Sequence, residues 1–289
     1  LEKNNVQIPS QVLSNPSHSD LRYIDLDNGF NLFYPKKLVN VSRFKFDEWL
    51  WNEAIKHENI IFHPESTVIK VQRGEKPAAL IRNKNDEKWF EADYIVGADG
   101  ASSSVRKSIT PIKATQYLAM QETIATPKKL SETKFVFCDQ ITDYYSWVIP
   151  KVDGIDIGTA VKFGQHFKLE LFKEWFAEQG FAGKTVKKEA HLLTRPASKN
   201  EIQLGRENIF LIGEAAGLVT SSTGEGISSA LLSANALASA LITNQENPLE
   251  AYRQNLSPVI DRILLKIVKG KLLSKKELRA EFSSYFSYI

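Results

Sequence analysis

The chain has 289 residues, of which 43% are hydrophobic and 25% are charged, as in ordinary globular proteins with one large or two medium domains. Its 37 basic and 34 acidic residues leave a formal net charge of +3, which does not indicate nucleic-acid binding. The single cysteine, Cys138, excludes an internal disulfide bond and a cysteine zinc site, and the scattered histidines predict no metal site. No run of about 18 apolar residues predicts a transmembrane helix.

Up to residue 91 the chain predicts a hairpin, a helix and a small meander. Residues 21–41 alternate between apolar and polar on both sides of Asp27-Asn28-Gly29, which is typical of a β-hairpin. The segment 43–56 has apolar side chains at helical spacing. Three short strands separated by polar turns are then expected at residues 67–72, 77–83 and 87–91.

The segment 93–106 predicts a strand followed by a turn of small residues. The strand ends at Gly97, and Asp99, Gly100 and Arg106 follow it. The alternative is an ordinary surface turn with an ion pair, in which the same types of residue also occur. We expect Asp99 to order the turn and Arg106 to anchor Asp99.

Between residues 111 and 200 the pattern changes to that of an antiparallel sheet. Strands are expected at residues 116–126, 134–139, 144–149, 155–162 and 189–193. One helix interrupts them at 167–179, where large apolar side chains recur at helical spacing. Tyr145 and Trp147 lie two residues apart in a strand, so both face the same side of the sheet. This region indicates a second domain with an apolar face.

The segment 208–242 carries the strongest functional signal. The apolar run 209–212 predicts a buried strand, and an Ala- and Leu-rich helix begins near Ile227. Four glycines in the loop between them let the backbone approach a ligand: Gly213, Gly217, Gly224 and Gly226. Free N–H groups at the helix start favour an anionic or electron-rich group, and Glu214 can accept hydrogen bonds from hydroxyl groups.

Together, the two strand ends resemble the two later flavin fingerprints of FAD-dependent reductases and monooxygenases with a glutathione-reductase-like fold. The resemblance implies that both segments bind FAD, through Gly97, Asp99, Gly100, Arg106, Gly213, Glu214, Gly217, Thr223, Gly224, Gly226 and Ile227. Amides near Gly226 and Ile227 would favour negative charge on the reduced flavin. This family usually has aspartate where Glu214 stands. Arg43, in a segment that resembles the family's Arg-x-x-Phe-Asp helix start, is expected either to reach FAD or to lie in solvent.

Another segment narrows the resemblance. The run Tyr145-Ser-Trp147-Val-Ile-Pro150 is similar to a segment of geranylgeranyl reductases that lines the substrate cavity beside the flavin. The resemblance implies that Tyr145, Trp147 and Pro150 line an apolar pocket. Without the resemblance, they are equally explained as ordinary core residues.

Proteins of this kind begin with a strand and a Gly-x-Gly-x-x-Gly loop that binds the ADP part of the cofactor. The sequence contains no such motif, and its only Gly-x-Gly is Gly224-Glu225-Gly226. We therefore expect an N-terminally incomplete chain that holds FAD weakly or not at all by itself. NAD(P)H or another reductant would supply the electrons.

After Asn247 the chain predicts helices at residues 249–269 and from 275 to about 288. The first carries the basic residues Arg253, Arg262, Lys266 and Lys269. A solvated face is the expectation for them, and contact with a membrane surface is the alternative.

The predicted fold class is α/β, with a three-layer FAD/NAD(P)-binding domain, incomplete at its N-terminus, and an inserted antiparallel α+β substrate domain. The FAD-binding domain is expected at 38–110 with 201–248, and the substrate domain at 1–37 with 111–200. C-terminal helices are expected at 249–289.

The expected function is that of a flavin-dependent oxidoreductase that reduces C=C bonds of a lipid or isoprenoid-like substrate by hydride transfer from reduced FAD. The alternatives are an FAD-dependent monooxygenase acting on an apolar or aromatic substrate, and an inactive fragment that cannot hold FAD. The expected partner is a small apolar substrate and not nucleic acid. No catalytic residue is assigned, and no oligomeric state is predicted. The expected location is the cytoplasm, with peripheral membrane contact left open.

Overall fold

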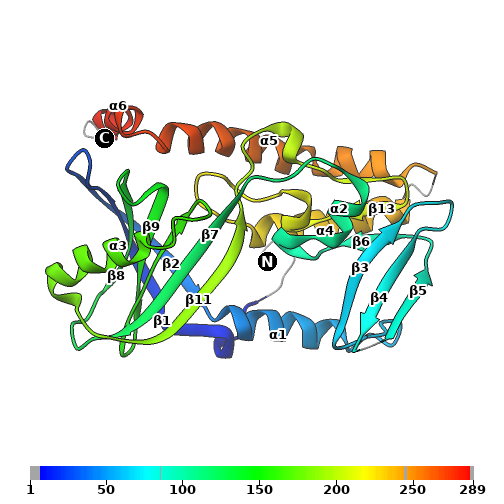
Figure 1. The fold of residues 1–289 in the computed structure, drawn as a ribbon, viewed down its shortest axis with the longest axis horizontal. Coiled ribbons are helices and arrows are strands. Elements are labelled where there is room, and N and C mark those ends of the chain that lie inside the picture. Colours follow the sequence, from blue (N-terminus) through cyan, green and yellow to red (C-terminus); the bar gives the residue numbers. More distant parts are fainter. Residues whose placement is uncertain (1–6, 85, 244–245, 287–289) are drawn as a thin grey trace. The chain divides into compact units, whose positions relative to one another are not determined.

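The computed structural model describes residues 7–84, 86–243 and 246–286, and it has the mixed α/β composition that was predicted (Figure 1). The described residues form two compact units. The first unit contains residues 7–63, 119–191 and 276–286, and the second contains 64–84, 86–118, 192–243 and 246–275. The units differ in bounds from the domains expected from the sequence, which remain a prediction.

The first unit is built on a seven-stranded sheet. In spatial order its strands are β11 (Lys184–Thr194), β7 (Gln116–Ala125), β10 (Gly154–Val161), β9 (Thr142–Lys151), β8 (Glu132–Cys138), β1 (Leu13–Asp25) and β2 (Phe30–Val41). The hairpin predicted around Asp27-Asn28-Gly29 is confirmed as β1–β2, whose strands pair antiparallel. β8 to β10 also pair antiparallel, whereas β1 and β8 are parallel.

The helix α3 (Lys168–Phe176) covers one face of this sheet and confirms the helix predicted at 167–179. Phe172 and Phe176 of α3 pack with Val148 of β9 and Ile157 of β10 in the core of the first unit. Residues of β9 alternate between buried and half-buried, because successive side chains of a strand point to opposite faces. The half-buried side chains of β9 therefore lie on the face opposite α3.

A buried carboxylate links α3 to the sheet. Glu122 of β7 is only 3% exposed. It is paired with Lys173 of α3 (2.7 Å) and Lys188 of β11 (3.0 Å), and it accepts a hydrogen bond from Thr185 Oγ1 (2.7 Å). Burial alone would raise the pKa of Glu122, but these three donors outweigh it and lower the pKa to about 2.

We expect Glu122→Gln to lower the free energy of unfolding by about 2–3 kcal/mol near neutral pH. The folded-state pKa lies below the unfolded value of 4.5, so this stabilisation is present above about pH 4.5 and is lost as the pH falls towards 2. Urea denaturation followed by circular dichroism, at neutral and at acidic pH, measures both effects. The control is Glu170→Gln, which removes the exposed second partner of Lys173. Equal losses in the two variants would contradict the role of Glu122.

In the second unit, β6 (Ile95–Gly97) and β13 (Ile209–Leu211) lie side by side in a three-stranded sheet with β12 (Gly205–Arg206). β6 and β13 are parallel, with Ile95 opposite Ile209 and Gly97 opposite Leu211. The prediction that these two distant segments share a sheet is confirmed.

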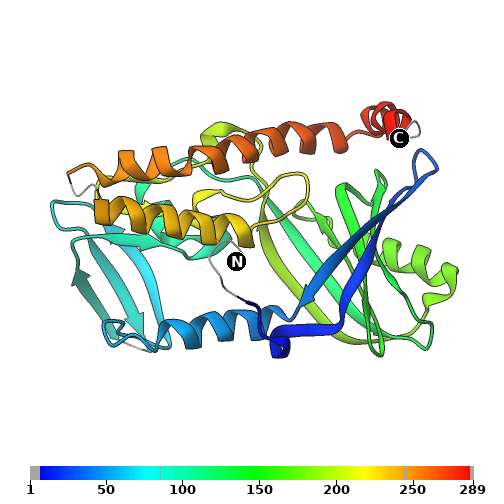
Figure 2. The same ribbon diagram turned by 180° about the vertical axis from the view of Figure 1, so that it is seen from behind.

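Two long helices complete the core of the second unit. α4 (Ile227–Thr243) and α5 (Pro248–Leu273) lie side by side, as Figure 2 shows in gold and orange. Tyr252 of α5 is fully buried, and its hydroxyl donates to the Leu211 carbonyl (3.0 Å). Burial raises the pKa of Tyr252 well above its usual range. The hydroxyl of Tyr252 thus anchors strand β13 to α5.

The predicted meander is also confirmed, as β3 (Ser66–Gln72), β4 (Ala78–Asn83) and β5 (Asp86–Glu91). α2 (Ser104–Ile109) packs against β3, where Ser108 Oγ accepts a hydrogen bond from Val71 N–H (3.1 Å).

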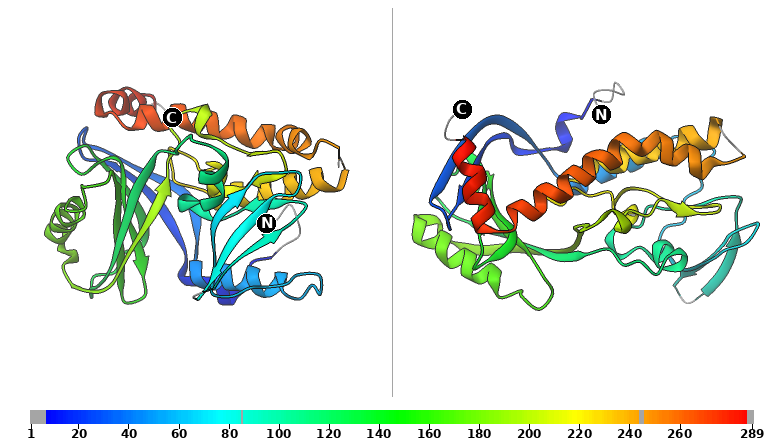
Figure 3. Two further views of the ribbon diagram at one scale, coloured as in Figure 1. Left: turned by 45° about the vertical axis from the view of Figure 1, so that its right-hand side comes forward. Right: turned by 90° about the horizontal axis from the view of Figure 1, so that it is seen from above.

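Two further helices belong to the first unit. α1 (Arg43–Ala54) begins after Ser42, whose side chain accepts a hydrogen bond from Lys45 N–H. α6 (Lys276–Phe286) lies beside the turn of the β1–β2 hairpin (Figure 3), and the Asn28 side chain donates to the Lys276 carbonyl (2.9 Å). None of the helices in the described part of the chain combines the length and the hydropathy needed to cross a membrane.

Candidate functional site

The carboxyl ends of β6 and β13 lie at the same edge of their sheet, because the two strands are parallel and in register. The chain leaves β6 towards Asp99 and leaves β13 towards Glu214. Gly97 is needed for packing here, since a Cβ atom would lie 2.7 Å from Leu211 Cδ2 and 2.8 Å from Val105 Cβ. The two predicted loops are therefore neighbours.

Asp99 orders its own turn, as expected. Its carboxylate accepts hydrogen bonds from Ser103 Oγ (2.5 Å), Ser104 N–H (2.7 Å) and Val105 N–H (3.2 Å), at the start of α2. Gly100 has a φ of 69°, and a Cβ atom there would meet nothing within 4 Å. The turn thus leaves open space beside Gly100.

Arg106 does not anchor Asp99, and this expectation was wrong. Its buried guanidinium donates to the carbonyls of Ala215 (3.0 Å) and Glu201 (2.7 Å). The physical reason is that the Asp99 carboxylate is already satisfied by donors of its own turn. Burial lowers the pKa of Arg106, and the nearby Glu201 carboxylate opposes this. Arg106 thus holds the loop after β13 in place.

The loop after β13 keeps a hydrogen-bond acceptor available. Gly217 has a φ of 79° in the left-handed region, which ends the short 3-10 turn Gly213–Ala216. Glu214 Oε1 accepts a hydrogen bond from Thr194 N–H (2.7 Å), whereas Oε2 has no donor among the described residues. Glu214 can therefore accept a hydrogen bond from a ligand without losing its contact with the protein.

The second half of the loop is organised by Thr220. Its Oγ1 accepts from Glu225 N–H (3.0 Å) and shares a hydrogen bond with Thr223 Oγ1 (2.6 Å), and its carbonyl accepts from Gly224 N–H (2.8 Å). Gly224 adopts a left-handed φ of 65°. The Ser222 hydroxyl is buried with no partner among the described residues.

The helix α4 begins directly after this loop. Its first backbone hydrogen bond runs from Ala230 N–H to the Gly226 carbonyl (2.9 Å), so the amides of Ile227 and Ser228 precede the hydrogen-bond ladder of the helix. Gly226 is not in the left-handed region, and a Cβ atom there would meet only Val219 Cγ2, at 3.5 Å. Apart from this contact with Val219, no atom of the described protein fills the space beside Gly226.

Arg195 is a residue that sequence reasoning missed. Its guanidinium donates to the Ser221 carbonyl (3.0 Å), the Tyr117 hydroxyl (2.9 Å) and the Gly270 carbonyl (3.3 Å). It thereby fixes the glycine loop to the end of β11 and to α5. No local motif marks Arg195, because its partners are 26, 78 and 75 residues away.

In the first unit, Tyr145 and Trp147 share the sheet face opposite α3, as their spacing predicted. The Trp147 ring lies against Gly158 of β10, where a Cβ atom would come within 2.4 Å of Cε2. Trp147 Nε1 donates to Gln121 Oε1 (2.8 Å), and the Tyr145 ring lies 4.9 Å from that of Phe135. We call Phe135, Tyr145 and Trp147 the aromatic face.

Two further predicted residues, Pro150 and Arg43, belong to the first unit. Pro150 is three residues from Trp147 and is buried on the other side of the sheet. Arg43 is in the first unit, with a side chain that is 65% exposed and 3.2 Å from Asp47. Pro150 therefore does not share the sheet face of Tyr145 and Trp147, and contact of Arg43 with FAD stays a prediction.

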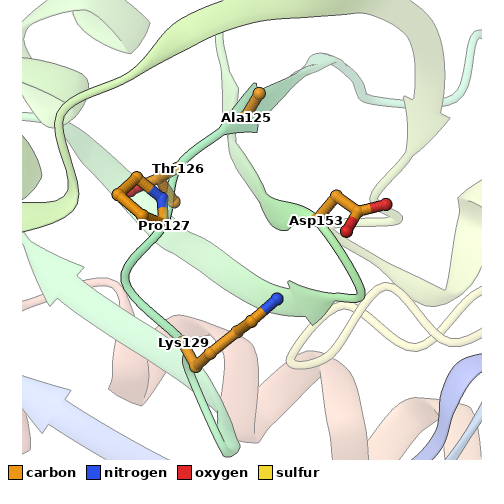
Figure 4. A pocket seen from close by; sticks show the side chains of 5 residues that line it. All are labelled: Ala125, Thr126, Pro127, Lys129 and Asp153. Carbon is orange, nitrogen blue, oxygen red and sulfur yellow. The ribbon is translucent and has the colours of Figure 1, made fainter.

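A small hollow lies at the turn between β9 and β10. It has a volume of about 380 Å³ and is lined by Ala125, Thr126, Pro127, Lys129 and Asp153 (Figure 4). Lys129 Nζ donates to the carbonyl of Val152 in this turn. Neither Tyr145 nor Trp147 lines the hollow, so it is separate from the aromatic face.

Comparison with known proteins identifies this arrangement. A family model described as "FAD binding domain" matches residues 10–141. Among solved structures, a geranylgeranyl bacteriochlorophyll reductase-like protein from Thermoplasma acidophilum matches with a TM-score of 0.78 at 21% identity, over 95% of this chain and 75% of that one. The p-nitrophenol 4-monooxygenase PnpA from Pseudomonas putida DLL-E4 matches with a TM-score of 0.66 at 15% identity, over 93% and 77%. The similarity of these two structures shows the fold alone.

The family match assigns an FAD-binding domain to this chain, as its motifs indicated. Protein CbrA of Escherichia coli O6:H1 is 32% identical over 281 residues, which cover 96% of this chain and 76% of CbrA. The chain belongs to the CbrA family.

The second unit fits the flavin end of FAD. The amides of Ile227 and Ser228 are donors suited to the electron-rich pyrimidine edge, and Glu214 Oε2 is an acceptor suited to a hydroxyl of the ribityl chain. The open space beside Gly226 lets a ring approach the helix start. The other predicted cofactor residues of the second unit shape the two loops, and direct contact with FAD stays a prediction for every residue assigned to it, including Glu214, Ile227 and Arg43.

Proposed function

We propose that the protein reduces C=C bonds of an apolar, lipid- or isoprenoid-like substrate, with FAD as the source of hydride. The observation that carries the proposal is the aromatic face, on which the Trp147 ring packs against Gly158 with Tyr145 and Phe135 beside it. Such a surface contacts an apolar chain over a large area at little cost in side-chain entropy. The matching Thermoplasma acidophilum protein is named reductase-like, which supports the same chemistry.

In this reaction one carbon of the double bond receives a hydride and its neighbour receives a proton. FAD, when bound and reduced, would supply this hydride, and oxidation of NAD(P)H or another reductant would reduce the flavin again. The amides of Ile227 and Ser228 would stabilise negative charge at the pyrimidine edge of the flavin, and Glu214 would position the ribityl chain that carries the ring. The aromatic face binds the apolar part of the substrate. The chain offers no group that we assign as the proton donor.

Trp147→Ala in the full-length protein is the test of the aromatic face. Because Trp147 is half-buried, we expect a modest loss of stability, a roughly ten- to thirtyfold rise in KM and unchanged FAD content. Thermal unfolding, flavin absorbance and turnover measure the three effects together. A matched control is Trp175→Ala, since Trp175 is also partly buried but packs against the core on the α3 side. A loss of about 3–5 kcal/mol with unchanged turnover per folded molecule would show that Trp147 is only a core residue.

The second candidate is an FAD-dependent monooxygenase, because the match to the p-nitrophenol 4-monooxygenase has the same fold. An aromatic face also suits an aromatic substrate. The two reactions differ in that a monooxygenase consumes dioxygen and adds one oxygen atom to its substrate, whereas a reductase needs no dioxygen.

A further inference from the structure

The C-terminal half of α5 exposes an apolar stripe to solvent. Leu265 is 71% exposed, Val268 58% and Leu272 39%. At 3.6 residues per turn these three side chains lie on one face of the helix. The opposite face, with Ile263 and Ile267, is buried in the core of the second unit. The stripe is therefore the outward face of a helix that is firmly packed.

Basic residues flank this stripe on both sides. By helical spacing, Arg262 and Lys266 lie along one edge and Lys271 lies along the other, and Lys275 follows directly after the end of the helix. These four side chains form no ion pair with a described residue, and the sequence has no acidic residue from 262 to 276. In the first half of the same helix, by contrast, Arg253 pairs with Glu250 (3.5 Å).

The positive charges are also close to one another. Burial, and then the neighbouring Lys266, lower the pKa of Lys269. An anionic partner would relieve this crowding of like charges.

We propose that this face of α5 docks on the surface of a bilayer that contains anionic phospholipids. Leu265, Val268 and Leu272 would enter the boundary between headgroups and acyl chains, and the flanking basic residues would meet the phosphates. Nucleic acid would match the charges but would leave the apolar stripe without a partner. A second copy bound through the same face would bring the same positive charges together. This inference does not depend on the proposed reaction.

Co-sedimentation of the full-length protein with vesicles tests the proposal. The vesicles contain phosphatidylcholine alone or mixed with phosphatidylglycerol. We expect binding to the mixed vesicles only, and a roughly 30-fold lower partition coefficient for the double variant K271Q/K275Q. L265S/V268S should lower partition by at least about tenfold. K113Q/K199Q makes the same change of charge at two exposed lysines elsewhere in the second unit and should bind like the wild type.

Circular dichroism and sedimentation velocity are measured on each variant. Failure of the folded wild type to bind mixed vesicles would overturn the proposal. An equal loss in K113Q/K199Q would show a general effect of charge instead of a docking face. A wild-type dimer that dissociates in L265S/V268S, without vesicle binding, would assign the stripe to a second copy of the chain.

Discussion

Gly226→Ala in the full-length protein is expected to weaken FAD binding by about 100-fold or more while leaving the free protein folded. The added methyl group has room in the protein itself, because its only neighbour within 4 Å is Val219 Cγ2, at 3.5 Å. Apart from this one contact, the added methyl group projects into the space at the start of α4 that we assign to the flavin. Titration with FAD, followed by flavin fluorescence, measures the affinity, and thermal unfolding without FAD measures the stability.

Gly224→Ala is the matched control for this variant, two residues earlier in the same loop. Gly224 has a left-handed φ of 65°, so an alanine there strains the backbone by about 1–2 kcal/mol. The control should therefore lose stability in the absence of FAD, whereas Gly226→Ala should not. Normal FAD affinity in Gly226→Ala would mean that the flavin does not approach this position.

Arg279→Met is expected to destabilise the first unit by about 3–5 kcal/mol. Arg279 of α6 is 4% exposed and forms ion pairs with Asp25 (2.8 Å), Asp139 (2.9 Å) and Asp27. Burial alone would lower the pKa of Arg279, but Asp25 and Asp139 outweigh it and raise the pKa. Without the guanidinium, the buried Asp25 carboxylate loses its cation and α6 loses its anchor on the β1–β2 hairpin.

Thermal unfolding measures this loss, and limited proteolysis at α6 reports whether the helix has detached. The double variant Arg279→Met with Asp25→Asn should recover part of the stability, because it removes the carboxylate that was left without a cation. A loss below about 1 kcal/mol, or no recovery in the double variant, would contradict an electrostatic anchor.

Local patterns in the sequence were sufficient to predict most of the elements. The alternation of β9 and the helical spacing in α3 and α5 reflect which faces are buried, and burial is what a local pattern records. The pairing of β6 with β13 was predicted because both strands end in glycine-containing loops of the same kind. The separation of Pro150 from Trp147 also follows from strand alternation, which the resemblance obscured.

Contacts of buried arginines could not be predicted in this way. Arg106 binds the carbonyls of Ala215 and Glu201, which are 109 and 95 residues away, and backbone carbonyls carry no signature in the sequence. Arg195 is hidden for the same reason. The exposed stripe of α5 could not be predicted either. The spacing of Leu265, Val268 and Leu272 does not distinguish a solvent-facing side of a helix from a buried one.

A single turnover without dioxygen tests the central claim most directly. The full-length protein, loaded with FAD and reduced, is mixed with an unsaturated isoprenoid alcohol such as geranylgeraniol. The flavin absorbance is recorded during the reaction, and the mass of the product is determined by mass spectrometry. We predict a product that has gained two hydrogen atoms, formed as the absorbance of oxidised flavin returns. The absence of product until dioxygen is admitted, followed by a product that has gained one oxygen atom, would contradict the account and identify a monooxygenase.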